Sequence, residues 1–243
     1  MSGHSKWNNI KKRKEATDGA KAKIFTKMAR EIAVAVKEGG GDPDSNGKLR
    51  DCIAKAKANN VPNDNIDRVI KKAVGSKDSN EYEDIIYEGY GPAGVAVIVE
   101  SLTDNRNRTA GDVRHYFDKC GGNLGQNGCV SFMFERKGVI AIEDESIDEE
   151  KLMEDCFEAG AADFDYEDGV AEIYTDPNEL GKVRDALEKK GYTFSSAEVE
   201  YVPSTYTKID DAELKDKMNR LLDMLEDNDD VQNVWHNWDS DEE

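Results

Sequence analysis

The hydrophobic pattern of this chain changes its period near residue 76, and this change limits the folds that the chain can adopt. Before that point apolar residues recur at helical spacing, and after it they form short strand-like runs that alternate with helical segments. A polar spacer, residues 76–80, separates the two patterns. The sequence therefore predicts an α+β protein with a helical N-terminal unit, and 243 residues are enough for two or three units.

Three helices are predicted in the N-terminal unit, residues 1–77. The first begins at Asp18, which can serve as its N-cap, and stops at the glycines 39–41. The second follows Asn46, and the third starts near Asn63. Each helix has an apolar stripe, so the three can share one small core. The opposite face of the first helix is predicted to carry Lys23, Lys27, Arg30 and Lys37.

Strand and helix signals alternate in residues 78–137. A strand, a glycine-rich turn at residues 89–94 and a buried strand at residues 95–99 come first. A helix follows, and the spacing of Thr109 and Asp112 is a variant of a capping box at its start. Residues 130–134 are predicted to return as a strand.

The elements predicted between residues 139 and 199 follow the order strand, helix, strand, strand, helix, strand, which is typical of a ferredoxin-like unit. A helix and a strand remain after it, and such a pair cannot bury its own faces, so we assign both to the preceding unit. The predicted domains are residues 1–77, a discontinuous α/β middle domain of residues 78–137 plus 207–243, and an inserted ferredoxin-like domain of residues 138–206. A sequential arrangement of the two α/β domains is the alternative.

Charge is divided unevenly along the chain. Residues 1–77 contain 18 Lys and Arg against 9 Asp and Glu, whereas the remaining residues contain 15 against 43. One end should therefore attract a polyanion and the other should repel it. This asymmetry favours a protein that binds nucleic acid.

The cations of the basic end lie in two places, a basic N-terminal segment (residues 6–14) and the first helix. Lysine and arginine bind phosphates without reading sequence, because each neutralised phosphate releases counterions. The candidate phosphate-binding residues are Lys6, Lys11, Lys12, Arg13, Lys14, Lys23, Lys27 and Arg30, and the alternative is an ordinary solvated face. Trp7 is a candidate to stack on a base or a ribose, or else it packs against the helical core.

Arg106, Arg108 and Arg114 form a second basic group in acidic surroundings. The first two are predicted just before a helix N-terminus, which itself favours an anion. The alternatives are a contact with nucleic acid and simple pairing with Asp104, Asp112 or neighbouring glutamates.

The sequence contains no recognisable catalytic or cofactor motif. Its three histidines are isolated, and its carboxylates occur in solvated runs. Residues 89–94 match GxGxxG, but a strand follows them where a helix is required, and residues 163–168 lack the glycine of a calcium loop. We therefore predict no enzymatic activity, no cofactor, no metal and no small-molecule substrate.

The cysteines and the hydropathy favour a cytoplasmic location. Four cysteines are scattered without a CxxC pair, so neither a zinc site nor a disulfide framework is indicated. No run approaches 18 apolar residues, and no apolar segment follows the N-terminal charges. We expect no membrane partner and no secretion signal.

Several segments of the sequence resemble the YebC family. They are SGHSKW at residues 2–7, KIFTK at 23–27, YEGYGP at 87–92, TDNRNRT at 103–109, MFERKG at 133–138 and DDVQNV at 229–234. The resemblance is specific because independent segments follow one another nearly from end to end. One departure is Phe132, where relatives often have Trp, and we interpret it as a conservative change of a core residue that affects only local packing.

The resemblance implies a three-domain YebC-like fold, with a helical N-terminal domain and two α/β domains, and no enzymatic activity. Members of the family are described as cytoplasmic DNA-binding transcriptional regulators, and organellar relatives as translational activators of cytochrome oxidase. A ribosome-associated role in relieving stalls at proline-rich stretches has also been proposed. The missing organellar leader favours the bacterial type.

Two functions therefore follow as expectations. The first is a non-enzymatic DNA-binding regulator of transcription that uses the basic end on phosphates. The second is a ribosome-associated translation factor that binds ribosomal RNA or tRNA with the same surface. A protein-interaction scaffold, which would bind neither, is a third class.

Overall fold

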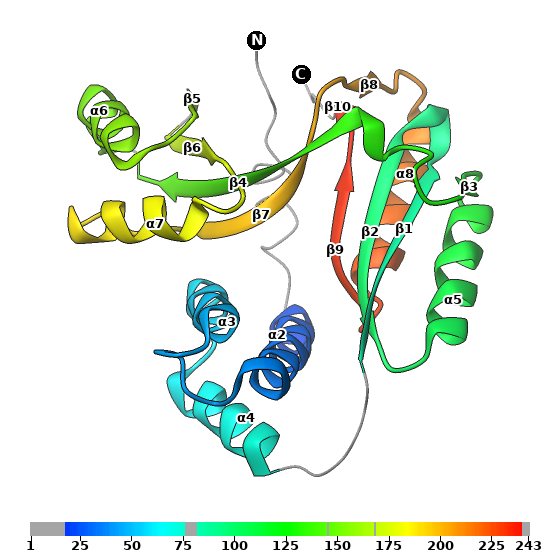
Figure 1. The fold of residues 1–243 in the computed structure, drawn as a ribbon. Helices are drawn as coiled ribbons and strands as arrows, with labels where there is room; N and C mark the ends of the chain where they lie inside the picture. The colour runs from blue at the N-terminus through cyan, green and yellow to red at the C-terminus, as the bar shows by residue number, and fades with distance from the viewer. Residues whose placement is uncertain (1–17, 76–81, 145, 168, 240–243) are drawn as a thin grey trace.

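The computed structural model describes residues 18–75, 82–144, 146–167 and 169–239. Figure 1 shows a helical unit below two sheets that lie side by side, each with helices on one face. All strand pairs within these two sheets are antiparallel. The predicted α+β class is therefore confirmed.

The helical unit consists of α2 (Asp18–Gly39), α3 (Gly47–Ala58) and α4 (Asn63–Gly75), as the sequence predicts. Its core gathers residues of all three helices, among them Ile32, Leu49 and Ile66. The buried Asn46 side chain joins α2 to α3, because its oxygen accepts from the Leu49 backbone N–H at 3.0 Å while its nitrogen donates to the Ala35 carbonyl at 2.7 Å. An N-cap and a helix–helix link are thus supplied by one residue.

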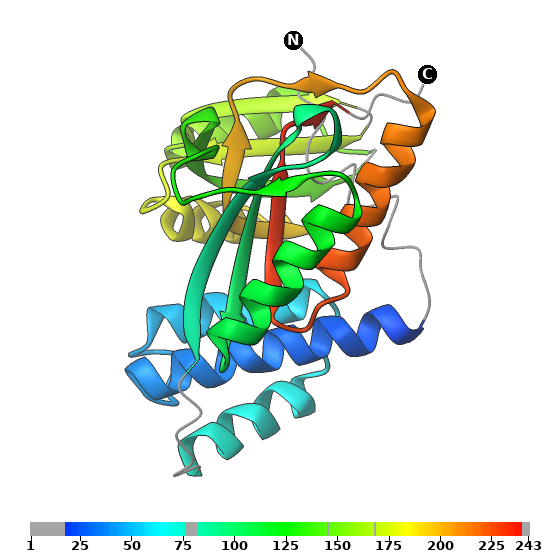
Figure 2. The same cartoon turned by 90° about the vertical axis from the view of Figure 1, so that its right-hand side faces the viewer.

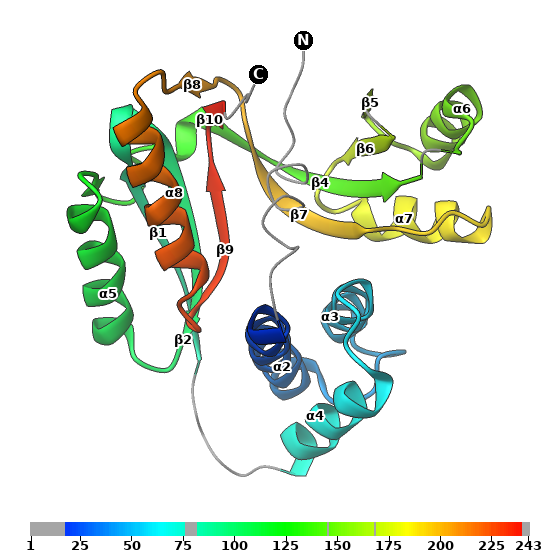
Figure 3. The same ribbon diagram turned by 180° about the vertical axis from the view of Figure 1, so that it is seen from behind.

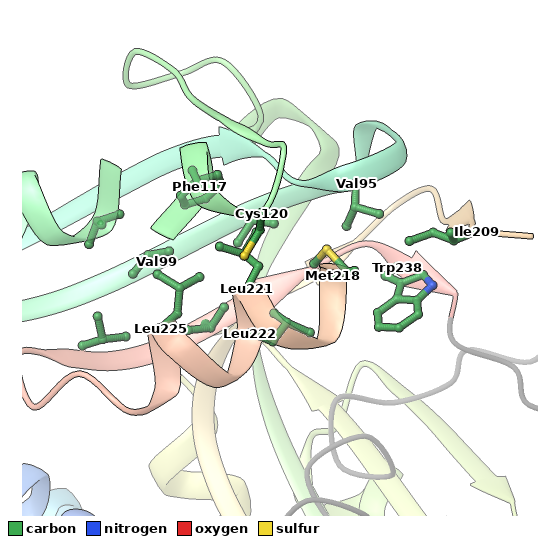
Figure 4. Packing of buried hydrophobic residues seen from close by; sticks show 14 residues of the cluster. Val95, Val99, Phe117, Cys120, Ile209, Met218, Leu221, Leu222, Leu225 and Trp238 are labelled. Carbon is green, nitrogen blue, oxygen red and sulfur yellow. The ribbon is translucent and has the colours of Figure 1, made fainter. Parts of the chain in front are cut away.

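The middle sheet has the strand order β3-β1-β2-β9. Its strands are β1 (Glu83–Tyr90), β2 (Ala96–Thr103), β3 (Asn123–Leu124) and β9 (Val231–His236). The helices α5 (Arg106–Lys119) and α8 (Ala212–Glu226) cover one face of it (Figure 3). Figure 4 shows the core beneath them, where Phe117, Met218 and Leu221 pack against the valines of β2. The late helix and strand therefore complete a sheet that the chain begins far upstream.

The turn between β1 and β2 is formed by the glycine-rich segment. Its centre is the 3-10 turn η1 (Pro92–Gly94), and the two strands pair on either side of it. The prediction that these glycines form a turn between strands is confirmed.

The ferredoxin-like order is confirmed in the second large sheet, whose strand order is β5-β6-β4-β7. Its elements along the chain are β4 (Phe134–Glu143), α6 (Glu149–Ala159), β5 (Asp163–Glu167), β6 (Val170–Thr175), α7 (Leu180–Lys189) and β7 (Ser196–Pro203). Two short strands, β8 (Thr207–Lys208) and β10 (Trp238–Asp239), pair in parallel beyond it. The residue limits of the three domains stay a prediction.

Two local predictions are wrong. Residues 130–134 do not form one strand, since the 3-10 turn η2 (Ser131–Met133) precedes β4. The helix α5 begins four residues earlier than the capping box requires, because the Asn105 side chain accepts from the Arg108 N–H at 3.1 Å and acts as N-cap. Thr109 is buried inside the helix instead. Both Asn105 and Thr109 satisfy the sequence rule for a cap, and only tertiary contacts decide between them.

The helical unit touches both sheets. Figure 2 shows α2 running beneath the lower ends of β1, β2 and α8. The helix α3 contacts β7 of the ferredoxin-like unit. These two contacts determine which cations of residues 1–77 already have partners inside the molecule and which are available to an external phosphate.

Candidate nucleic-acid interface

The predicted interface has two parts, and the structure describes only one of them. Lys6, Trp7, Lys11, Lys12, Arg13 and Lys14 lie outside the described residues. The cations of α2 and of α5 lie within them. Their surroundings decide whether each can meet a phosphate.

The cations of α2 face an acidic loop, residues 226–230, that connects α8 to β9. Lys23 Nζ lies 2.6 Å from Asp227 Oδ1. Lys27 Nζ donates to the Glu226 carbonyl at 2.7 Å. Arg30 Nη1 donates to the Asp229 carbonyl at 2.8 Å and to Asp230 Oδ1 at 2.7 Å. The three candidate residues of α2 therefore already have acceptors within the molecule.

Lys27 is the most strongly perturbed of these cations. Burial lowers its pKa from 10.5 to about 8, although the carboxylates of Glu226 and Asp229 act in the opposite direction. A lysine that is held out of water in this way is a weak counterion for an external phosphate. Its position favours a structural role in joining α2 to the acidic loop.

Asp230 connects the helical unit to the middle sheet. Its carboxylate is buried and accepts hydrogen bonds from Arg30, from Arg108 Nη2 at 2.7 Å and from Thr109 Oγ1 at 2.8 Å. Burial alone would raise its pKa, but these hydrogen bonds outweigh burial and the pKa lies below its ordinary value. Asp230 is therefore an ionised anchor that holds two arginines from different units.

Arg106 and Arg108 lie in the first turn of α5, not before it as the sequence analysis placed them. Arg108 Nη2 also lies 2.9 Å from Asp104 Oδ1, so Arg108 is paired on two sides. Arg106 is exposed, and among the described residues it forms no hydrogen bond or ion pair. Of the two, only Arg106 is available to an external anion without first leaving a partner.

A second contact of the helical unit also uses cations. Lys55 Nζ lies 3.1 Å from Glu31 Oε1 and 3.0 Å from Glu198 Oε2 of β7. Burial lowers the pKa of Lys55, but the two carboxylates outweigh it and raise the pKa above its ordinary value. Arg184 of α7 pairs with Asp51 of α3 at 2.9 Å. The basic end is thus fixed to both neighbours by charge.

Three cations on the outside of the helical unit, which the charge pattern did not single out, are exposed to solvent. Lys57 of α3 and Lys71 and Lys72 of α4 are exposed, and none pairs with a carboxylate in the part of the chain that the structure describes. The signal that could have found them is their place outside the apolar stripe of each helix. They are further candidates for contact with a polyanion.

The described residues show no candidate metal site and no membrane-spanning helix. No group of three His, Cys, Asp or Glu in residues 18–75, 82–144, 146–167 and 169–239 could hold a metal ion. Within the same ranges no helix has the length and the apolar content to cross a membrane. The four cysteines are free thiols.

Comparison with known proteins identifies the family. A model described as the TACO1/YebC protein N-terminal domain matches residues 5–76, and one described as the TACO1/YebC second and third domain matches residues 82–238. The chain belongs to the TACO1/YebC family. The family resemblance of the sequence motifs is thereby confirmed.

Relatives in this family match over the whole chain. A protein of Finegoldia magna is 60% identical over 240 residues, which cover 99% of this chain and 100% of the relative. One of Caldicellulosiruptor bescii is 60% identical over 244 residues and covers 100% of both. Both are named "Probable transcriptional regulatory protein".

The fold also agrees with a solved TACO1/YebC-like structure. The crystal structure of a conserved hypothetical protein from Aquifex aeolicus matches with a TM-score of 0.83 and 46% sequence identity over 93% of each chain. The multi-domain α+β architecture is therefore shared with a relative of known structure.

Proposed function

We propose that this protein is a non-enzymatic regulator of gene expression that acts in the cytoplasm and binds nucleic acid through its basic N-terminal end. The observation that carries the proposal is the division of charge, with 18 cations against 9 anions in residues 1–77 and 15 against 43 in the rest. The names of the relatives supply the regulatory class. DNA is the proposed polyanion.

The described contacts suggest which cations bind phosphate. Lys23, Lys27, Arg30 and Arg108 have acidic or carbonyl partners inside the molecule. We therefore assign the main phosphate contacts to Lys6, Lys11, Lys12, Arg13 and Lys14, with Arg106 as a further candidate. Trp7 lies in the same segment and is our candidate for stacking on a base or a ribose.

Binding through these residues should depend mainly on charge. Lysine is a point charge with little geometric preference, whereas base-edge recognition in the major groove needs Arg, Asn or Gln presented together on a helix. The acidic domains, which a polyanion repels, would orient the basic end toward the ligand. Such a protein holds the phosphate backbone and does not by itself select a sequence.

The alternative function is a ribosome-associated translation factor that binds ribosomal RNA or tRNA and relieves stalls at proline-rich stretches. The lysine-rich character of the basic end favours it as much as it favours DNA, because RNA offers the same phosphates in a helix whose deep groove side chains cannot read. The chemistry is shared, so the experiment has to separate the two partners.

The test measures binding of the full chain to a labelled 20-base-pair duplex and its co-sedimentation with ribosomes over one salt series. For a DNA-binding regulator that neutralises about four to six phosphates, log affinity for the duplex should fall with log salt at a slope of roughly −3 to −5. Retention on ribosomes at salt concentrations where duplex binding is lost would favour the alternative. A preference above roughly a thousandfold for one duplex sequence would contradict binding through the backbone alone.

A matched pair of variants controls for general charge. Replacing Lys11 and Lys12 by Ala should reduce the steepness of the salt dependence, while Lys151→Ala with Lys189→Ala removes two exposed cations of the ferredoxin-like unit and should not. Equal effects of the two variants would contradict the assignment to the basic N-terminal segment.

A further inference from the structure

Residues 119–134 are the longest stretch of the chain without an acidic residue, 16 positions in a protein with 52 Asp and Glu. This acid-free segment lies within the acidic part of the molecule and includes β3 and η2. We infer that it is a second nucleic-acid contact, at which Phe132 stacks on an unpaired base of a single strand. The inference rests on the proposed function and adds a class of ligand to it.

Phe132 is presented outward from a segment that is otherwise anchored. Its side chain is 74% exposed, the largest exposed fraction of any large hydrophobic residue in the described part of the chain. Its neighbours Val130 and Phe134 are buried in a cluster with Ile98 and Trp235, on the face of the middle sheet opposite α5 and α8. The ring is therefore held clear of the core by contacts on both sides of it.

A buried carboxylate fixes the backbone beneath this ring. Glu88 of β1 accepts hydrogen bonds from the backbone N–H groups of Gly128, Val130 and Ser131 at 2.8, 2.9 and 2.9 Å. Burial would raise the pKa of Glu88, but these hydrogen bonds outweigh it and the pKa is lowered. The Tyr90 hydroxyl also donates to the Cys129 carbonyl at 3.1 Å. The Glu88 carboxylate is thus satisfied by backbone N–H groups of the segment, and these hydrogen bonds hold the backbone in place beneath the ring.

The surroundings of the ring suit a nucleic acid. The exposed side chains of the segment beside it are the amides Asn123, Gln126 and Asn127, which can donate to and accept from base edges. Arg136 follows on β4, with its guanidinium 5.9 Å from the Tyr201 ring in the same cluster. The carboxylate nearest to Phe132 along the chain is exposed Glu135, whose Oε2 lies 3.1 Å from Lys137 Nζ. Sites for single-stranded nucleic acid combine positive charge with aromatic rings on which bases stack, and this surface offers a cation, polar amides and one exposed ring.

A protein partner is the competing occupant, and the surface favours it less. A protein interface normally centres on several apolar side chains around an anchor. Here the exposed neighbours of Phe132 are polar or glycine, and the apolar side chains Val130 and Phe134 face inward. One isolated ring matches one planar base, because every base offers a face for stacking.

The experiment compares three labelled probes, a 12-nucleotide single-stranded RNA, the same sequence as single-stranded DNA, and a 12-base-pair duplex. Each is titrated with the full chain and with Phe132→Ala, Phe132→Leu and Phe132→Trp. Loss of one stacking contact should weaken single-strand binding roughly 5- to 150-fold in the Ala and Leu variants, and the Trp variant should stay within about threefold of wild type. Duplex affinity and the salt dependence should not change, because the lost contact carries no charge.

The Leu variant separates the two occupants, since it keeps apolar bulk but has no aromatic face. Single-strand affinity that is unchanged in all three variants, while the wild-type chain binds both strands and duplex, would overturn this inference and leave the proposed function standing. Full affinity in Phe132→Leu together with loss in Phe132→Ala would also overturn it, because bulk alone would then suffice. If the wild-type chain binds no probe at low salt, the proposed function is contradicted, and the inference that rests on it is contradicted as well. A larger effect on RNA or on DNA identifies which single strand is the ligand.

Discussion

The inner face of α2 and the acid-free segment differ in how many cations they carry and in whether carboxylates face them. The helix brings Lys23, Lys27 and Arg30 to a surface where a loop of acidic residues meets each of them. The acid-free segment has a single cation, Lys119, yet its one associated carboxylate, Glu88, is already satisfied by backbone N–H groups. The first surface is rich in cations that are internally compensated, and the second is poor in cations but contains no carboxylate of its own.

A count of lysines therefore does not locate a polyanion site. Arg30 must give up the buried Asp230 carboxylate, 2.7 Å from its Nη1, before it meets a phosphate, so its net contribution to binding is small. A surface without carboxylates needs no such exchange. The following predictions test whether α2 is a structural surface and the acid-free segment an open one.

The largest effect is expected at Asp230, on the α2 side of the comparison. Asp230→Asn leaves Arg30 and Arg108 without their shared carboxylate and should lower the free energy of unfolding by roughly 3–5 kcal/mol. Thermal unfolding of the full chain measures it. The matched control is Asp229→Asn, whose side chain is exposed and should contribute less than about 0.5 kcal/mol. Equal effects would show that the acidic loop acts through its total charge and not through this anchor.

Lys27 should make stability depend on pH in the alkaline range. Its pKa is about 8 in the folded chain and 10.5 when unfolded, so between these values the unfolded state binds more protons and the free energy of unfolding rises with pH. The contribution is at most about 3 kcal/mol. Lys27→Met should flatten this rise, as measured by denaturant unfolding from pH 7.5 to 10.5. An identical pH profile in wild type and variant would mean that Lys27 is solvated and free.

A substitution of Glu88 tests whether its hydrogen bonds hold the backbone of the acid-free segment in place. Glu88→Gln keeps the shape of the side chain but removes the charge that strengthens three hydrogen bonds, and we expect a loss of about 1–2 kcal/mol. Because the folded pKa of Glu88 is lowered, its stabilisation is present above pH 4.5 and is lost as the pH falls through the folded value. Amide hydrogen exchange at Gly128, Val130 and Ser131 should accelerate. The control Glu83→Gln, exposed on the same strand, should leave all three amides protected.

The order of elements could be predicted from the sequence because it depends on local periodicity. Helix limits at Asp18 and Asn46 followed from caps and glycines, and the ferredoxin-like order followed from alternating periods. The start of α5 could not be predicted, since Asn105 and Thr109 are both good caps and the buried contact of Thr109 with Asp230 excludes it from that role.

The candidate site was harder to predict than the fold. The cations were found correctly as residues, but their partners come from residues 226–230, about 200 positions away, and no local pattern reveals such a contact. Phe132 was interpreted only as a core position with a conservative change, because a Val-x-Phe-x-Phe spacing does not say which ring faces outward. The absence of acidic residues around it was visible in the sequence and was the signal to use.

The smallest effect separates the two groups of basic residues directly. Lys14→Ala, in the basic N-terminal segment, should reduce the slope of log affinity against log salt by up to about one unit, as loss of one phosphate contact requires. Lys23→Ala should leave the slope unchanged, because Lys23 Nζ already lies 2.6 Å from Asp227 Oδ1. This exposed pair contributes little to stability, so its loss should not unfold the chain. Both single variants should unfold at the wild-type temperature. If Lys23→Ala reduces the slope as much as Lys14→Ala, α2 leaves the acidic loop when nucleic acid binds. Residues 226–230 would then act as a competitor that the phosphates displace, and the two surfaces would differ only in what covers them.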